Sequence, residues 1–296
     1  MKNFFTITAI LVVLVAGSAM FNSCSKDIVE QNMNYPMINP TRVDANAGTW
    51  RPILLTAANE FACPAPIATT SPDYIIQLNE IKSFQGEITN EEKNLVKYWG
   101  AGAVLRWNEI MRELVALHNL PPYQNPDGSY PFPSANNPLA YPTFPFANPP
   151  YAARAYAYLS AAQYDACVGA YFYKQQFNRP APFTVDATIQ TLLPKSTLPS
   201  YPSEDAAVLG ASVEILKLMF PGDQDYINLR AEEHKRARLI AGANVRSDLD
   251  AGEALGKLIA AKFVTRARGD RAGAAAGNAT LWAKLKSDCI ARGETP

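Results

Sequence analysis

The longest nearly continuous apolar stretch in the chain after its first two dozen residues lies at 201–220, YPSEDAAVLGASVEILKLMF. Its first residues are typical of a helix N-terminus, because the Ser203 hydroxyl can accept a hydrogen bond from a backbone N–H two or three residues further on. Pro202 precedes the helix, where its missing N–H costs nothing. The residues that follow are small or apolar almost throughout. We therefore predict a helix buried at the centre of its domain.

The start of this helix is also a candidate anion site. Unpaired backbone N–H groups and the helix dipole favour negative charge there. Glu204 and Asp205 occupy the first turn and are the alternative occupants, because first-turn carboxylates commonly satisfy these groups.

Apolar residues recur at helical spacing in several other segments. Thr89 and Glu92 form a capping-box pattern that opens a predicted long helix ending near Leu120. Within this helix, Trp99 and Trp107 are predicted packing residues. His118 is interpreted as a residue compatible with the dipole of its C-terminus.

No alternating strand pattern occurs, so we predict an all-α, multi-helix bundle. We expect Gly242–Arg246 to break a helix, and Ser247 or Asp248 to cap the next one. Further helices are predicted at 72–84, 149–177, from about 223 onward, and 279–291.

The N-terminus predicts an exported lipoprotein. Lys2 precedes an apolar run, Phe4–Phe21, that is short for a transmembrane helix, and Ser23 precedes Cys24. Lipidation of Cys24 would anchor the chain to the outer membrane, in the periplasm or at the cell surface. Signal cleavage without a lipid is the alternative. We predict a signal peptide at 1–24, a flexible tether at 25–50 and a single all-helical domain at 51–296, whose first residues, 51–66, form an extended arm on the core.

The composition gives no support to some classes of function. The 27 basic and 27 acidic residues balance, which gives no indication of a nucleic-acid partner. The four cysteines and two histidines form no metal-type cluster, so no metal or cofactor is expected. The Pro-rich and Asn-rich segment 121–150 is interpreted either as a lid over a site or as a strap between helices.

Three segments resemble the type-2 phosphatidic acid phosphatase and vanadium haloperoxidase superfamily, in particular its secreted members from Bacteroidetes-type bacteria. They are KQQFNRPAP at 174–182, YPSEDAAVLGA at 201–211 and ARLIAGANVRSDLDAG at 237–252. The corresponding family motifs are K-x6-RP, PSGH and SR-x5-H-x3-D. The resemblance implies the helical fold of that superfamily and a pocket for phosphate or vanadate at helix ends.

The resemblance also implies roles for individual residues. Cations and a helix N-terminus would bind phosphoryl oxygens, while histidines and an aspartate would perform the chemistry. The implied phosphate-binding residues are Lys174, Arg179, Ser203, Arg238 and Gly242. The implied catalytic positions are Asp205, Asn244 and Asp248.

Both motif histidines are replaced. Asp205 stands at the general-acid position and Asn244 at the nucleophile position, while Ala181 stands at the first arginine position, with Arg179 two residues earlier. An amide is neither a phosphoryl nucleophile nor a vanadate ligand of the imidazole kind.

Three functions remain open at this point. The first is a phosphoesterase that acts on a small phosphorylated molecule and uses Asp205 for proton transfer. The second is a non-catalytic binding or scaffold lipoprotein, in which Arg238 and Asp248 would form an internal ion pair. The third is vanadate-dependent haloperoxidase chemistry, which ranks last because of Asn244.

Overall fold

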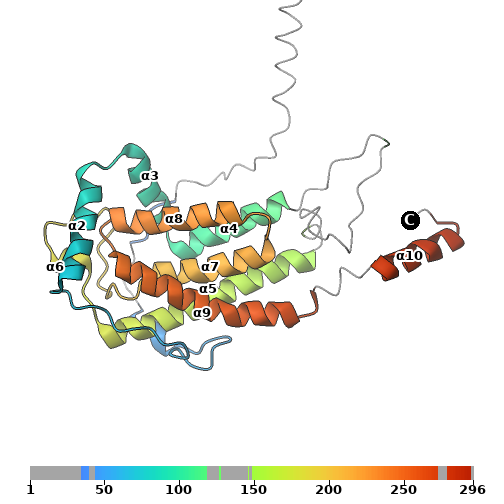
Figure 1. The fold of residues 1–296 in the computed structure, drawn as a ribbon, viewed down its shortest axis with the longest axis horizontal. Helices are drawn as coiled ribbons and strands as arrows, with labels where there is room; N and C mark the ends of the chain where they lie inside the picture. The colour runs from blue at the N-terminus through green and yellow to red at the C-terminus, as the bar shows by residue number, and fades with distance from the viewer. Residues whose placement is uncertain are drawn as a thin grey trace, which may run out of the picture. The chain divides into compact units, whose positions relative to one another are not determined.

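The protein is described from a computed structural model that covers residues 35–39, 44–118, 127, 146, 149–272 and 279–294. Within these residues the chain is helical and has no strand, as predicted (Figure 1). The predicted signal peptide, most of the tether and most of the 121–150 segment lie outside the described residues. No helix among those described is long and apolar enough to cross a membrane.

Helix α7 (Glu204–Met219) is the central element (Figure 1). It packs against α5 (Pro149–Phe177), α9 (Arg246–Gly269), α8 (Gln224–Ile240) and α4 (Ala103–Leu117). Most of its residues are buried, which confirms the central position predicted from its composition.

The contact between α7 and α9 is unusually close, and two glycines of α9 permit it. A Cβ atom at Gly252 would collide with the backbone oxygen of Ser203, and one at Gly256 would collide with that of Ala207. The backbone N–H of Ser203 donates to the backbone oxygen of Asp248 at 2.9 Å. The N-terminal turns of the two helices are therefore held together through their main chains.

The remaining described elements lie outside this pair. They are a short 3-10 helix, η1 (Ala45–Thr49), on α5, and the helices α2 (Pro72–Gly86), α3 (Asn90–Trp99), α6 (Pro182–Val185) and α10 (Ala279–Ala291). The predicted capping box is present, since Thr89 and Glu92 satisfy each other's backbone N–H groups at the start of α3. The single long helix predicted after Thr89 is wrong: α3 ends at Trp99, and Gly102, at φ 111°, turns the chain into α4.

A second correction concerns the start of α9. The helix begins at Arg246, before the predicted caps. Asp248 instead lies in its first turn, where one carboxylate oxygen accepts from the Val245 backbone N–H at 2.8 Å. The Asp248 carboxylate therefore caps the N-terminus of α9 from a position within its first turn.

The arm at 51–66 has no helix and is fastened to α5 by one carboxylate. Asp165, which is fully buried, accepts backbone hydrogen bonds from Ile53 at 2.6 Å, Leu54 at 2.8 Å and Leu55 at 3.0 Å. Hydrogen bonds to a buried ionised group are among the stronger ones in proteins. One side chain thus supplies the polar partners for three consecutive residues of the arm.

We expect Asp165→Asn to lower the free energy of unfolding by about 2 kcal/mol or more, because the amide offers one acceptor oxygen and points an NH2 group at a backbone donor. Urea denaturation measures this loss, and limited proteolysis within 51–66 reports release of the arm. Asp73→Asn, at an exposed site on α2, serves as the control and should change stability by less than about 0.5 kcal/mol. Equal stability of the two variants would contradict the role of Asp165.

Candidate functional site

A pocket of about 440 Å³ opens beside the N-terminus of α7. Its wall is built from the α3–α4 junction, the last turns of α5, the loop at 191–200, the first turn of α7 and the end of α8 with its following loop. The charged and polar residues on this wall include Tyr171, Lys174, Lys195, Ser200, Glu204, Asp205, Arg238 and Asn244.

Ser203 fixes the start of α7 at this pocket. It is fully buried, and its hydroxyl accepts from the Ala206 backbone N–H at 3.2 Å, as the sequence predicts for an N-cap. The two residues that follow, Glu204 and Asp205, are only partly buried and lie on the pocket wall. The first turn therefore presents two carboxylates where an anion site was a candidate.

Glu204 is paired with the lysine of the first motif. The Lys174 ammonium, almost fully buried near the end of α5, lies 2.7 Å from Glu204 Oε2 and also donates to the backbone oxygen of Pro199. Glu204 therefore compensates the charge of Lys174 within the protein, and the Pro199 carbonyl accepts a hydrogen bond from the ammonium group.

Asp205 is paired with the arginine of the third motif. Arg238 Nη1 lies 3.0 Å from Asp205 Oδ2, and Arg238 Nε donates to Asn244 Oδ1 at 3.0 Å. The Asn244 amide in turn donates to the backbone oxygen of Ser200 at 3.2 Å. Asn244 thus acts as a buried hydrogen-bond bridge between α8 and the loop that leads into α7.

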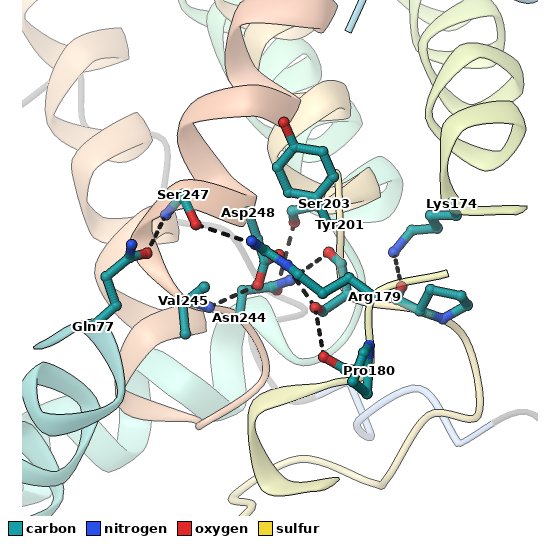
Figure 2. A network of polar contacts seen from close by, with 12 residues as sticks. Gln77, Lys174, Arg179, Pro180, Tyr201, Ser203, Asn244, Val245, Ser247 and Asp248 are labelled. Carbon is teal, nitrogen blue, oxygen red and sulfur yellow. Dashed lines mark hydrogen bonds and ion pairs between the residues drawn. The ribbon is translucent and has the colours of Figure 1, made fainter. Parts of the chain in front are cut away.

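Arg179 and Asp248 form a separate, buried node (Figure 2). Arg179 Nη2 donates to Asp248 Oδ1 and, at 3.1 Å, to the Ser247 hydroxyl. The Ser200 hydroxyl lies 3.2 Å from the same Asp248 oxygen, and the Ser247 backbone N–H donates to Gln77 Oε1 at 2.7 Å. This node joins α2, the 178–203 loop and the start of α9.

Aromatic rings enclose the Arg179 guanidinium. Its central carbon lies 4.4 Å from the centre of the Tyr201 ring and 5.2 Å from that of Tyr74. Burial raises the pKa of Tyr74 to about 12, with a smaller contribution from the Asp248 carboxylate. Tyr74 is therefore a neutral phenol under all ordinary conditions.

The sequence-predicted site residues separate into two groups. Lys174, Asp205, Arg238 and Asn244 come together on the pocket wall. Those outside its lining are Arg179, Ser203, Gly242 and Asp248. Gly242 forms the turn after α8 at φ 68°, where the backbone oxygen of Gln190 leaves no room for a side chain.

The internal ion pair proposed from sequence between Arg238 and Asp248 is wrong. Arg238 pairs with Asp205, and Asp248 pairs with Arg179. The reason is geometric: Asp248 faces inward from the first turn of α9, towards the 178–203 loop, whereas Arg238 lies on the pocket wall.

The sequence analysis assigned no role in the pocket to Glu204 or Tyr171. From the sequence, Glu204 was recognised only as a first-turn carboxylate, and no sequence pattern indicated its pairing with Lys174. Tyr171 lies one turn before Lys174 on α5, so the three-residue spacing in a helix would have placed both on one face. Burial raises the pKa of the Tyr171 hydroxyl, and Glu204 adds to the shift.

Neither histidine of the chain lines the pocket. His118 Nε2 lies 2.6 Å from Asp223 Oδ2, at the C-terminal end of α4. His234 stacks on Trp99 with ring centres 4.1 Å apart, and its Nδ1 accepts from Trp107 Nε1 at 3.3 Å. Burial lowers the pKa of His234 well below its usual range, with Arg238 and Arg230 adding to the effect.

Trp99 and Trp107 are buried, as predicted for packing residues. Among the described residues, no group of three or more His, Cys, Asp or Glu side chains is arranged to hold a metal ion.

No protein-family model matches the chain, and no curated protein matches it. Solved structures do. The chain is similar to the structure of the first bacterial vanadium-dependent iodoperoxidase, with a TM-score of 0.57 and 18% identity over 81% of this chain and 62% of that one.

It is also similar to a bacterial vanadium-dependent chloroperoxidase. The holo form aligns with a TM-score of 0.55 over 76% of this chain and 55% of that one, and the apo form with 0.57 over 76% and 56%, both at 13% identity. The chain thus spans about 55 to 62% of the length of these structures. At such identities the likeness is one of fold, and the chain has the all-helical fold of the vanadium haloperoxidases.

Proposed function

We propose that this protein is a non-catalytic binding lipoprotein that keeps the haloperoxidase fold without its oxyanion chemistry. One observation carries the proposal: both cations of the motif pocket, Lys174 and Arg238, are already paired with the protein's own carboxylates, Glu204 and Asp205.

These pairs act against an incoming phosphate or vanadate. Such an anion would have to displace two carboxylates that are tethered to the same helix turn, or bind beside them. At a separation of 4 Å, two like charges repel by about 1 kcal/mol in water and about 4 kcal/mol near a protein surface. The pocket therefore disfavours the ligand that its motifs resemble.

Among the described residues, the pocket wall also lacks the histidines that the motifs of the resembled superfamily carry. No imidazole lines it, and the Asn244 amide oxygen is engaged by Arg238. Vanadate does not fit this donor set, because no imidazole is available to bind it and two carboxylates face the space.

A phosphoesterase is the alternative, because Asp205 lies on the same wall as Lys174 and Arg238. In that mechanism Asp205 would move the proton and the two cations would bind the phosphoryl oxygens. The ion pair of Asp205 with Arg238 argues against it, since it occupies both groups at once.

The purified protein should release no phosphate from p-nitrophenyl phosphate. Its melting temperature should not change with millimolar inorganic phosphate or orthovanadate, whereas a ligand at about a hundred times its Kd would stabilise it by about 2.7 kcal/mol. Differential scanning fluorimetry measures the melting temperature, and a phosphate-release assay measures the turnover. Turnover that disappears in Asp205→Asn would establish the phosphoesterase instead.

Removing the two carboxylates should restore oxyanion binding. In the double variant Glu204→Gln with Asp205→Asn, Lys174 and Arg238 lose their carboxylate partners next to the N-terminus of α7, and inorganic phosphate should then raise the melting temperature by several degrees.

The matched control for this double variant is Glu80→Gln with Asp186→Asn. It removes two ion-paired carboxylates outside the pocket lining and changes the net charge equally. It should remain insensitive to phosphate. A double pocket variant that also stays insensitive would show that the carboxylates are not what excludes the anion.

The proposal includes export and a lipid anchor at Cys24, for the sequence reasons given above. We expect the chain expressed in a bacterial host to incorporate radiolabelled palmitate and to fractionate with outer membranes. Cys24→Ser should abolish the label and release the protein in soluble form. Labelling that survives this substitution would place the lipid elsewhere.

A further inference from the structure

We propose that the pocket beside α7 binds a neutral, polyhydroxylated small molecule, namely a sugar or a cyclitol. This inference rests on the proposed non-catalytic function and names the ligand class of the same site. The pocket volume of about 440 Å³ lies within the range of roughly 300–1,000 Å³ typical of small-molecule sites.

The charge balance of the pocket favours a neutral ligand. Lys174 and Glu204 cancel, as do Arg238 and Asp205, and each pair is within ion-pair distance. A charged ligand would have to break one of these pairs and leave the displaced group without compensation. Lys195 adds one positive charge, but it is exposed to solvent.

The unused hydrogen-bonding capacity of the pocket favours hydroxyl groups. Among the described residues, nothing donates to Glu204 Oε1 or Asp205 Oδ1, and the Arg238 Nη2 and Tyr171 hydroxyl groups have no hydrogen-bond partner. The four residues that carry these groups, Glu204, Asp205, Arg238 and Tyr171, all line the same pocket. A ligand hydroxyl can donate to a carboxylate and accept from a guanidinium at the same time.

The other walls suit the carbon skeleton of such a ligand. Aromatic and aliphatic side chains line the same pocket, among them Tyr171, Phe183, Leu105, Leu193 and Val208. Sugars and cyclitols present C–H groups between their hydroxyls, which can pack on these surfaces while the hydroxyls reach the ion pairs. A simple inorganic ion would leave the apolar walls unused.

The test uses isothermal titration calorimetry and thermal melts of the purified protein with glucose, galactose, mannose, N-acetylglucosamine and myo-inositol. Putrescine and inorganic phosphate serve as charged comparison ligands. At least one neutral compound should bind. Asp205→Asn and Tyr171→Phe should each weaken that binding about tenfold or more, as expected for loss of a hydrogen bond in a partly buried site.

Asp270→Asn is the matched control. Asp270 pairs with Arg154 at side-chain exposures of 21% and 23%, close to the 15% and 17% of Asp205 and Arg238, but lies outside the pocket lining. The Asp270→Asn variant should bind the same neutral compound as tightly as the unmodified protein does. Circular dichroism checks that all three variants are folded, and Tyr171→Phe, which alters no charge, keeps the test valid if Asp205→Asn unfolds.

Three outcomes would overturn the inference: no neutral compound binds, putrescine binds in preference to all of them, or the bound compound is unaffected by both pocket substitutions. Absence of sugar binding together with absence of phosphate turnover removes this inference alone. Phosphate turnover or phosphate binding by the unmodified protein removes the proposed function as well.

Discussion

The close backbone contact between α7 and α9 is the constraint on which the rest of the structure depends. Gly252 and Gly256 bring α9 against the main chain of α7, and the hydrogen bond from the Ser203 N–H to the Asp248 oxygen fixes their relative register. Small residues allow two helices to approach this closely only if nothing projects between them. Because both helices begin at the same end, their first turns meet there, and the pocket opens beside the first turn of α7.

The buried node of Arg179 and Asp248 holds this end of the bundle together. Taking two charges out of water is costly, and the cost is offset only where the geometry is good and further hydrogen bonds are made. Ser200, Ser247 and the Val245 backbone N–H supply such bonds to Asp248 and to Arg179 Nη2 (Figure 2), whereas Arg179 Nε and Nη1 have no hydrogen-bond partner among the described residues. The arginine that the motif resemblance would assign to an oxyanion is thereby committed to holding a loop against two helices.

Much of the fold was predictable from local pattern, and much of the site was not. The Ser203 cap and the Thr89 capping box depend on neighbours within three residues, so the sequence displays them directly. The turn at Gly102 was missed because helical spacing of apolar residues continues on both sides of it. The hydrogen-bond partners of Asp165 and Arg179 lie more than sixty residues away along the sequence. Whether they meet depends on how the loops fold over the core. Motif spacing identified four residues of the pocket wall, but it did not reveal which charges neutralise one another.

That pairing of charges matters more for function than the identity of the motif residues. A lysine and an arginine at a helix N-terminus form an oxyanion site only while their charge is available. Here two adjacent carboxylates, Glu204 and Asp205, project from the first turn of α7 and each meets one of these cations. The same helix turn carries both carboxylates, and α9 holds that turn in place through its glycines, so both carboxylates stay within reach of the two cations. The mutual compensation of Lys174 with Glu204 and of Arg238 with Asp205 thus follows from the fold, and a ligand that binds there has to match an array of paired charges.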